Sequence, residues 1–437
     1  MALRPEDVID LKSPGDHAGV FNALRPVTRR RPHGFRIQFG RMSLYGNNDM
    51  THQATIELAA PADDVEAIQV IIGNGGGTTG FGVRVCAQSI PNKSDLNGDP
   101  GAFVTITGTD IETLGTTPWL APPPPTPTAQ RRAYSLSDWA DIPSVARDDG
   151  GFGALYVIRC YISSNSPLWF LGQTGDDFTS WAAHPSRMWA MRINSGNCTP
   201  DGGTPSNFVS STNVSRSPIL GIRYRRRTGK VITLMNQGDS IDESQGAGLT
   251  RQCEGWMFKA AQQLQAQYPA YAFEVANTAW SGSTYRSFGR RLGDVLGAGL
   301  VPDVMVFPCG SPNDPPDPPA LITKAITGRA EGYMSEMLRL CRQYETRPMI
   351  RSWLPTDTTV HDWNGTDAER RRWNAECKAR PDFDFLDFSS VSDGAIDGDG
   401  QVPYANGFTT DGIHPNDAGV TAMAPLAAAK IAEVLRL

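Results

Sequence analysis

Ser240 follows an apolar run that has the character of a buried strand. The run, Val231 to Met235, leads into Gly238-Asp239-Ser240 and then into Gly-rich sequence that is compatible with a helix. A serine at such a turn stands at the carboxyl end of the strand, where open α/β sheets place their sites. Its hydroxyl would lie near the N-terminal amides of the next helix, which suits a nucleophile. Taken alone, Gly-Asp-Ser is as typical of a turn or a helix N-cap.

Asp411 and His414 could supply the base that such a nucleophile needs. They lie at positions i and i+3, just before the last helical pattern of the chain. In a turn or nascent helix these positions share one side, so the carboxylate can accept a hydrogen bond from imidazole Nδ1–H. That bond would fix the tautomer and leave Nε2 free to take the proton of Ser240. Pro415 restricts the histidine before it to extended backbone. The alternative is a surface or capping histidine.

Two further polar stretches follow strand-like runs. Asn277-Thr-Ala-Trp-Ser-Gly-Ser-Thr284 is the first, and Gly310-Ser-Pro-Asn-Asp314 follows the apolar run Val304 to Phe307. Together with the stretches around the serine and the histidine, they resemble the consensus blocks of the SGNH (GDSL-type) hydrolases, a family of esterases and lipases. The four blocks occur in the family's order, and the resemblance covers residues 229–437.

The resemblance implies a role for each block. Ser240 would be the nucleophile, His414 the general base and Asp411 the residue that orients the histidine. The N–H groups of Ser240 and Gly282 and the side chain of Asn313 would form the oxyanion hole. In comparable acyl-transfer enzymes each such donor is worth about 3 kcal/mol.

The third block departs from the family pattern in one respect. Ser311 and Pro312 both stand between Gly310 and Asn313, where the family usually has a single residue. The shape of this loop is therefore open, more than the role of the asparagine. Two acidic neighbours have modest expected roles. Asp239 makes turn hydrogen bonds, and Asp314 either supports the asparagine loop or solvates a turn.

Composition excludes several classes of function. The chain has 437 residues, which favours two domains, and its 40% apolar content is enough for hydrophobic cores. A net charge of −6 leaves no nucleic-acid-binding footprint. The basic runs at residues 29–31 and 225–227 are expected to be solvated surface or linker, with an anionic-polysaccharide surface as the alternative.

No metal or cofactor is predicted. The seven cysteines lack any CxxC pair, and the six histidines lack ligand spacing; the cysteines stand at positions 86, 160, 198, 253, 309, 341 and 377. The glycine run at residues 73–77 lacks the Gly-Lys-Ser/Thr of a P-loop and predicts a hairpin turn. The N-terminus has no apolar segment of a Sec signal, and no run of about 18 apolar residues predicts a membrane span. We therefore expect cytoplasmic synthesis, with virion association or release by a non-Sec route as alternatives.

The N-terminal half has the pattern of a β domain. Residues 1–33 form a Pro-rich arm, and residues 34–228 are predicted to be an antiparallel β-sandwich of jelly-roll type. A polyproline II segment at residues 121–128 would cross its surface. The short strands are expected at residues 35–39, 54–58, 68–72, 81–85, 103–107, 155–162, 169–171, 188–193 and 219–224. Thr228-Gly229 is the predicted domain boundary.

Tryptophans are frequent in this half. They could stack on sugar rings, but packing between sheets is the more common role of large aromatic side chains. Packing is the expectation for four of them, and the fifth, Trp181, is the least core-like; the five are Trp119, Trp139, Trp169, Trp181 and Trp189.

The C-terminal half, residues 229–437, alternates strands and helices. This alternation predicts parallel pairing in a three-layer α/β/α domain, with the blocks that follow strands gathered at one sheet edge. After the strand at residues 231–235, strands are expected at residues 272–275, 304–307, 349–354 and 385–388, and helices at residues 248–267, 286–297, 319–344, 366–379 and 418–436. Residues 391–410 read as a loop, and Asn416 or Asp417 as the cap of the last helix.

The predicted function is a serine esterase that removes small acyl groups, above all O-acetyl groups, from a carbohydrate. Small acyl groups need little pocket, and residues 391–410 do not resemble an apolar lipase lid. The alternative is a component of a phage or phage-like particle that binds cell-surface polysaccharide, whose hydrolase domain trims or only recognises it. A cytosolic acyl-ester hydrolase ranks third. The expected partners are the acylated carbohydrate or small ester, with a homo-oligomer or virion proteins as open alternatives.

Overall fold

The structure is a computed structural model of the 437-residue chain. Predictions for the N-terminal arm up to residue 32, the polyproline segment, Trp119 and Trp181 lie outside the residues that it describes. These are residues 33–38, 42–45, 50–73, 82–95, 98–106, 134–163, 168–171, 173–174, 188–192, 216–217, 219–244, 255–297, 299–314, 324–357, 367–398, 400–405 and 407–437.

A nine-stranded sheet runs through the molecule. Its C-terminal part is parallel, in the order β18 (Asp384–Leu386), β17 (Arg347–Arg351), β16 (Val304–Pro308), β14 (Lys230–Asn236) and β15 (Tyr271–Asn277). Next to β15, β1 (His33–Gln38) pairs in parallel, and the sheet then continues antiparallel through β13 (Ile219–Arg226), β4 (Val65–Gly73) and β7 (Tyr134–Leu136). One sheet therefore holds strands from both halves of the chain.

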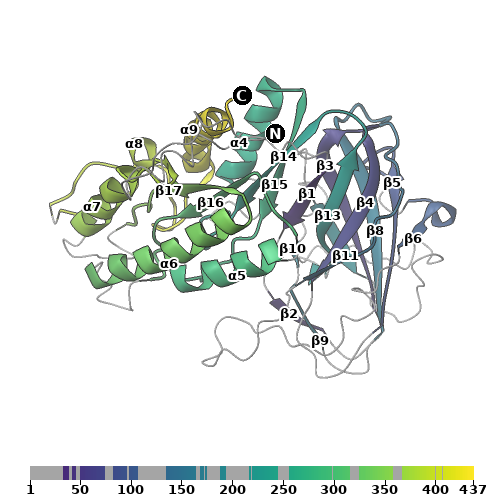
Figure 1. The fold of residues 1–437 in the computed structure, drawn as a ribbon, viewed down its shortest axis with the longest axis horizontal. Helices are drawn as coiled ribbons and strands as arrows, with labels where there is room; N and C mark the ends of the chain where they lie inside the picture. The colour runs from purple at the N-terminus through teal and green to yellow at the C-terminus, as the bar shows by residue number, and fades with distance from the viewer. Residues whose placement is uncertain are drawn as a thin grey trace, which may run out of the picture.

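Helices cover both faces of the parallel part (Figure 1). On one face lie α4 (Trp256–Gln267), α8 (Ser389–Ser392) and α9 (Asp417–Leu435), and on the other α5 (Tyr285–Gly297), α6 (Lys324–Gln343) and α7 (Asp367–Lys378). Side chains alternate along β14, as strand geometry requires: Ile232 and Leu234 enter the core under α4 and α9, whereas Met235 enters the core under α5 and α6. This is an α/β domain of the three-layer kind with a mostly parallel sheet.

A second, antiparallel sheet covers the other part of the large sheet (Figure 1). Its order is β11 (Met188–Arg192), β3 (Met50–Pro61), β8 (Gly153–Ser163), β5 (Gly82–Ile90) and β6 (Val104–Ile106). Apolar residues of this sheet and of β4 and β13 share one buried core. Two small ladders join β2 (Met42–Tyr45) to β9 (Leu168–Leu171) and β10 (Gln173–Thr174) to β12 (Arg216–Ser217). The jelly-roll-like sandwich stays a prediction.

Buried polar groups connect the two halves. Glu274 on β15 accepts hydrogen bonds from Ala59 N–H on β3 and from the Tyr224 hydroxyl on β13, the latter at 3.0 Å. Arg36 on β1 donates to the Val275 carbonyl oxygen at 3.1 Å. These contacts span the predicted boundary, which falls in the turn between β13 and β14; the division into domains stays a prediction.

Several expectations differ from the structure at the level of single elements. The strand predicted to reach Leu354 ends at Arg351, because Trp353 N–H donates to the Asn374 side chain at 2.9 Å and leaves the ladder. Phe388 precedes α8 and does not extend β18. α4 begins at Trp256; the predicted start of this helix, residues 248–254, lies outside the described ranges. Asn416 is the N-cap of α9, because its side chain accepts a hydrogen bond from Gly419 N–H at 3.1 Å.

The basic run at residues 225–227 is not uniformly solvated surface, so that prediction was wrong for one residue. Arg226 is buried, since its guanidinium pairs with Asp64 at 2.5 Å. Trp139 packs against Arg223 and Arg225, whose guanidinium carbons lie 5.4 and 4.8 Å from its ring centre.

Among the described helices, only α9 is long and apolar enough to span a membrane, and half of its apolar window is buried, as in a core helix.

Candidate active site

Ser240, His414 and Asp411 form a hydrogen-bonded chain. His414 Nε2 lies 2.8 Å from Ser240 Oγ, and His414 Nδ1 lies 2.7 Å from Asp411 Oδ2. Because a carboxylate only accepts, the proton between them belongs to Nδ1, and Nε2 is left to accept from the serine hydroxyl. The two contacts join the turn that follows β14 to the loop before α9, at the carboxyl end of the parallel sheet.

The Asp411 carboxylate is held by its own loop. Its Oδ1 accepts hydrogen bonds from His414 N–H at 2.8 Å and from Ile413 N–H at 3.0 Å. Burial raises the pKa of Asp411, but these hydrogen bonds and the imidazole contact outweigh it, so the pKa lies below its ordinary value. The group is therefore ionised at neutral pH and can stabilise an imidazolium.

The serine sits on a tight, buried turn. A side chain at Gly238 would meet Asp242 Oδ2 at 1.9 Å, so the position requires glycine. Asp242 in turn pairs with Arg351 on β17 through two contacts of 2.8 and 2.6 Å, and both side chains are buried. The ion pair joins the turn that carries Ser240 to a strand two places along the sheet from β14. Only 6% of Ser240 is exposed.

The predicted oxyanion groups lie on neighbouring loops. Gly282 has φ +74°, is exposed, and would meet nothing within 4 Å if it carried a Cβ. Within the described residues, neither its N–H nor that of Ser240 donates to another group of the protein. Asn313 Nδ2 donates one hydrogen bond to the Ser283 carbonyl oxygen at 3.0 Å, which leaves its second hydrogen available.

In the third block, which has one residue more than the family pattern, Ser311 makes a buried hydrogen bond. Ser311 is fully buried, and its hydroxyl donates to Asp239 Oδ2 at 2.6 Å. Asp314 accepts from Ser311 N–H at 3.2 Å and from Tyr285 N–H, the first residue of α5, at 2.9 Å. Burial raises the pKa of Asp314 to about 6 despite these two bonds. Asp314 therefore supports the loop, one of its two predicted roles, and Asp239 bonds to another block as well as to its own turn.

This geometry predicts different outcomes for two loop variants. Asn313→Ala is expected to lower kcat about 100- to 1,000-fold on an acetyl ester with KM little changed, because the amide would act mainly in the transition state. Ser311→Ala should lose thermal stability, since Asp239 loses a buried donor. Its kcat should fall less than that of Asn313→Ala. Steady-state kinetics and melting curves of both variants check this, and the reverse order of kcat losses would contradict it.

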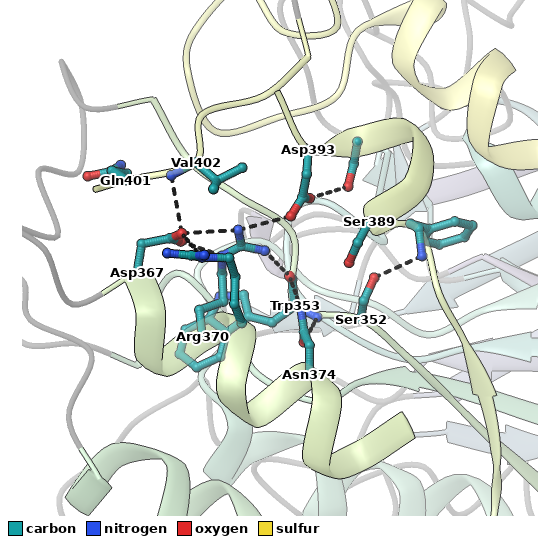
Figure 2. A network of polar contacts seen from close by, with 12 residues as sticks. Ser352, Trp353, Asp367, Arg370, Asn374, Ser389, Asp393, Gln401 and Val402 are labelled. Atoms are coloured by element: carbon teal, nitrogen blue, oxygen red, sulfur yellow. Dashed lines mark hydrogen bonds and ion pairs between the residues drawn. The ribbon is translucent and has the colours of Figure 1, made fainter. Parts of the chain in front are cut away.

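A second polar network anchors the loop that leads to the histidine (Figure 2). Arg370 on α7 contacts Asp367 at 2.6 Å and Asp393 at 3.2 Å, and it donates to the Trp353 carbonyl oxygen at 2.9 Å. Asp367 also accepts from Val402 N–H at 3.2 Å. Further along this loop, the Tyr404 hydroxyl donates to the carbonyl oxygen of Ile413 at 2.9 Å. The network thus connects α7 to the residue that precedes His414.

Arg370→Met is expected to destabilise the protein by about 3 kcal/mol, because it removes the cation of the half-buried Asp393 and leaves the buried Asp367 with only the partly exposed Arg371. Arg339→Met is the matched control: Arg339 pairs with Glu336 on the exposed face of α6, and its loss should barely move the denaturation midpoint. Urea denaturation of both variants measures the difference. Equal midpoints for the two would show that the network in Figure 2 contributes no stability.

A model of the GDSL-like Lipase/Acylhydrolase family matches residues 237–422. This part of the chain belongs to that family. The match spans the serine, both predicted oxyanion loops and the Asp411/His414 loop, so all the predicted site residues lie inside the GDSL-like domain. The search of curated proteins found no match.

Solved structures similar to part of this chain were also found. One is a GDSL-like lipase from Bacteroides thetaiotaomicron (18% identity, 47% of this chain and 87% of that chain, TM-score 0.32). A second is a member of the lipolytic G-D-S-L family from Veillonella parvula (19%, 45% and 96%, 0.33). A third is a variant of an acetyl xylan esterase from Geobacillus stearothermophilus (20%, 47% and 96%, 0.34).

Sequence reasoning missed the buried charges beneath the GDSL-like site. Asp242 and Glu243 come two and three residues after the serine, and two acidic residues so near a predicted nucleophile were the available signal. Arg291 shares the apolar face of α5 with Phe288 and Leu292, and a cation on such a face signals a buried partner. Arg351 follows the buried apolar residues Met349 and Ile350 at the end of β17 and gives the same signal.

Proposed function

We propose that the GDSL-like domain hydrolyses carboxylic esters through an acyl-enzyme on Ser240. The observation that carries this proposal is the chain of 2.8 and 2.7 Å contacts through Ser240, His414 and Asp411. Ser240 Oγ attacks the ester carbonyl while His414 Nε2 takes its proton, and the imidazolium then protonates the departing alcohol. Water, activated by the same imidazole, attacks the acyl-enzyme and releases the acid.

The oxyanion of each tetrahedral intermediate would be held by three donors. These are the N–H groups of Ser240 and Gly282 and the side-chain amide of Asn313. Support comes from their chemistry: each has a hydrogen that no described group of the protein accepts, and each belongs to a loop at the same sheet edge. Fixed donors of this kind act most strongly on the charge that develops in the transition state.

The proposed substrate is a short acyl ester, above all an O-acetyl group, on a carbohydrate. The groups beside the serine are polar: Gly282 is exposed, and Ser281, Asn313 and His414 are partly exposed. A polar, open rim suits an alcohol that carries many hydroxyls, and an acetyl group needs little apolar space.

A chain-length series tests this proposal. p-Nitrophenyl acetate, butyrate and octanoate are compared on the wild type, with acetate release from acetylated polysaccharides measured in parallel and Ser240→Ala as the blank. We expect kcat/KM for acetate to exceed that for octanoate at least about tenfold, since the polar rim formed by the described residues offers an octanoyl chain little apolar contact, and such contact is worth roughly 1–3 kcal/mol of discrimination. Faster hydrolysis of the octanoate would contradict the proposed acyl size, and an inactive wild type would contradict the hydrolase itself.

Two finer alternatives stay predictions: that the chain is a component of a phage-like particle, and that its β-rich half binds polysaccharide. Wild type and Ser240→Ala would bind a glycan equally if the β-rich half recognises it without hydrolysis. Loss of binding on changing the site would assign recognition to the GDSL-like domain.

A further inference from the structure

Gly282 occupies the third position of a tight turn. Ser283 N–H donates to the Trp280 carbonyl oxygen at 3.2 Å, which closes a four-residue turn with Ser281 and Gly282 at its centre. The φ of +74° at Gly282 is that of a type II turn, whose third residue has φ near +80°. A Cβ at this position would meet no other atom within 4 Å, so lack of space does not explain the glycine. Glycine is favoured here because it adopts a positive φ without strain.

The direction of the Gly282 N–H depends on the turn type. Types I and II differ by a rotation of about 150–170° in the dihedrals on either side of the central peptide. That rotation exchanges the positions of the Ser281 carbonyl oxygen and the Gly282 N–H. One turn type would therefore present a donor to an oxyanion, and the other would present a carbonyl oxygen that repels it.

Glu243 holds the turn from one side through a hydrogen bond. It lies three residues after Ser240, is 1% exposed, and its Oε2 accepts from Ser281 N–H at 2.5 Å. A buried carboxylate in so short a contact fixes the peptide that leads into the turn. The hydrogen bond also joins the nucleophile segment to the segment that carries Gly282.

Arg291 holds the turn from the other side through two hydrogen bonds. It projects from α5, is 5% exposed, and donates to the Ser283 hydroxyl at 2.5 Å and to the Gly238 carbonyl oxygen at 2.8 Å. Burial lowers the pKa of Arg291 to about 10, against the opposing charges of Glu243 and Asp239, so the guanidinium is protonated at neutral pH. One side chain thus contacts the segments on both sides of the predicted oxyanion hole.

We propose that Glu243 and Arg291 are positioning residues that hold the Trp280–Ser283 turn in its type II form, so that the Gly282 N–H faces the oxyanion. This assignment rests on the proposed hydrolase function. Neither residue touches the substrate, and each acts through the backbone that it holds. Because the Gly282 N–H would act mainly in the transition state, loss of either residue's hydrogen bonds should reduce kcat and leave KM nearly unchanged.

The test compares Glu243→Ala, Glu243→Gln and Arg291→Lys on p-nitrophenyl acetate in the full-length protein. We expect kcat to fall about 10- to 100-fold in Glu243→Ala and in Arg291→Lys, whose single ammonium cannot span both acceptors, with KM within about threefold of wild type. Glu243→Gln retains an acceptor oxygen for Ser281 N–H and should recover most of the kcat. In a Gly282→Ala background, where the turn is already changed, Glu243→Ala should lower kcat by less than about threefold more.

Arg159→Lys is the matched control. Arg159 is also fully buried, but it lies on β8 in the second sheet and bonds to Gln53 at 2.9 Å. The Arg159→Lys substitution should lower the melting temperature without changing kcat. The assignment is overturned if Glu243→Ala and Arg291→Lys keep kcat within twofold of an active wild type, or if Arg159→Lys loses as much kcat as they do. An inactive wild type would instead overturn the hydrolase proposal together with this assignment.

Discussion

Ser240→Ala is expected to reduce turnover of an acetyl ester by about 10⁴-fold or more, to the level of the buffer blank, because no other group can form the acyl-enzyme. His414→Ala should lose a similar amount, since its Nε2 lies 2.8 Å from the hydroxyl that it would deprotonate. Asp411→Asn should retain less than about a hundredth of the wild-type rate, because an amide can stabilise the wrong imidazole tautomer.

The control for these variants is Ser335→Ala, which removes a hydroxyl from the exposed face of α6. It should keep wild-type kinetics. All four proteins should show similar circular dichroism, because the triad side chains contribute little to either apolar core. Near-normal hydrolysis by a folded Ser240→Ala would remove the serine from the mechanism.

Removing residues 1–226 is expected to abolish folding as well as activity. The fragment would lose β1, which pairs with β15 through Ile37 and Ala276, and would expose the edge of a buried parallel strand. The core under α5 and α6 would lose Phe35, Ile37 and further residues of β4 and β13. Although the family match begins only at residue 237, we expect the fold around it to depend on the first half of the chain.

A nicked version of the full chain is the matched control for this deletion. A protease site placed in the exposed turn at residues 227–229 would cut the backbone and keep every strand. The two pieces should stay associated and hydrolyse the ester, because the sheet and Glu274 still join them. A soluble fragment starting near Arg227, with a cooperative melt and wild-type kinetics, would contradict this expectation and favour an independent domain.

The sequence contained most of what positions the predicted triad. The spacing of Asp411 and His414 predicted that a carboxylate would meet Nδ1, and the two atoms lie 2.7 Å apart. Strand-like runs before each block predicted a common sheet edge, and β14, β15 and β16 are neighbours in the sheet. These features depend on local periodicity and on short spacings, which a single sequence displays directly.

The long-range pairing could not be predicted from the sequence. The period of a strand says which face is buried but not which strand lies beside it. Nothing in residues 35–39 indicates that β1 borders β15, more than 200 residues later. The same holds for Glu243 and Arg291, because the fold alone brings a helix residue beside the carbonyl oxygen of Gly238.

Covalent labelling tests the central claim most directly. A fluorophosphonate reacts with a serine only when a base activates it, so the phosphonyl group marks the nucleophile itself. After incubation of the folded wild type and proteolysis, mass spectrometry should find one adduct, on the peptide that contains Ser240, and none in His414→Ala or Ser240→Ala. An unlabelled wild type, or an adduct on a different serine, would contradict the assignment of Ser240 as the nucleophile of this domain.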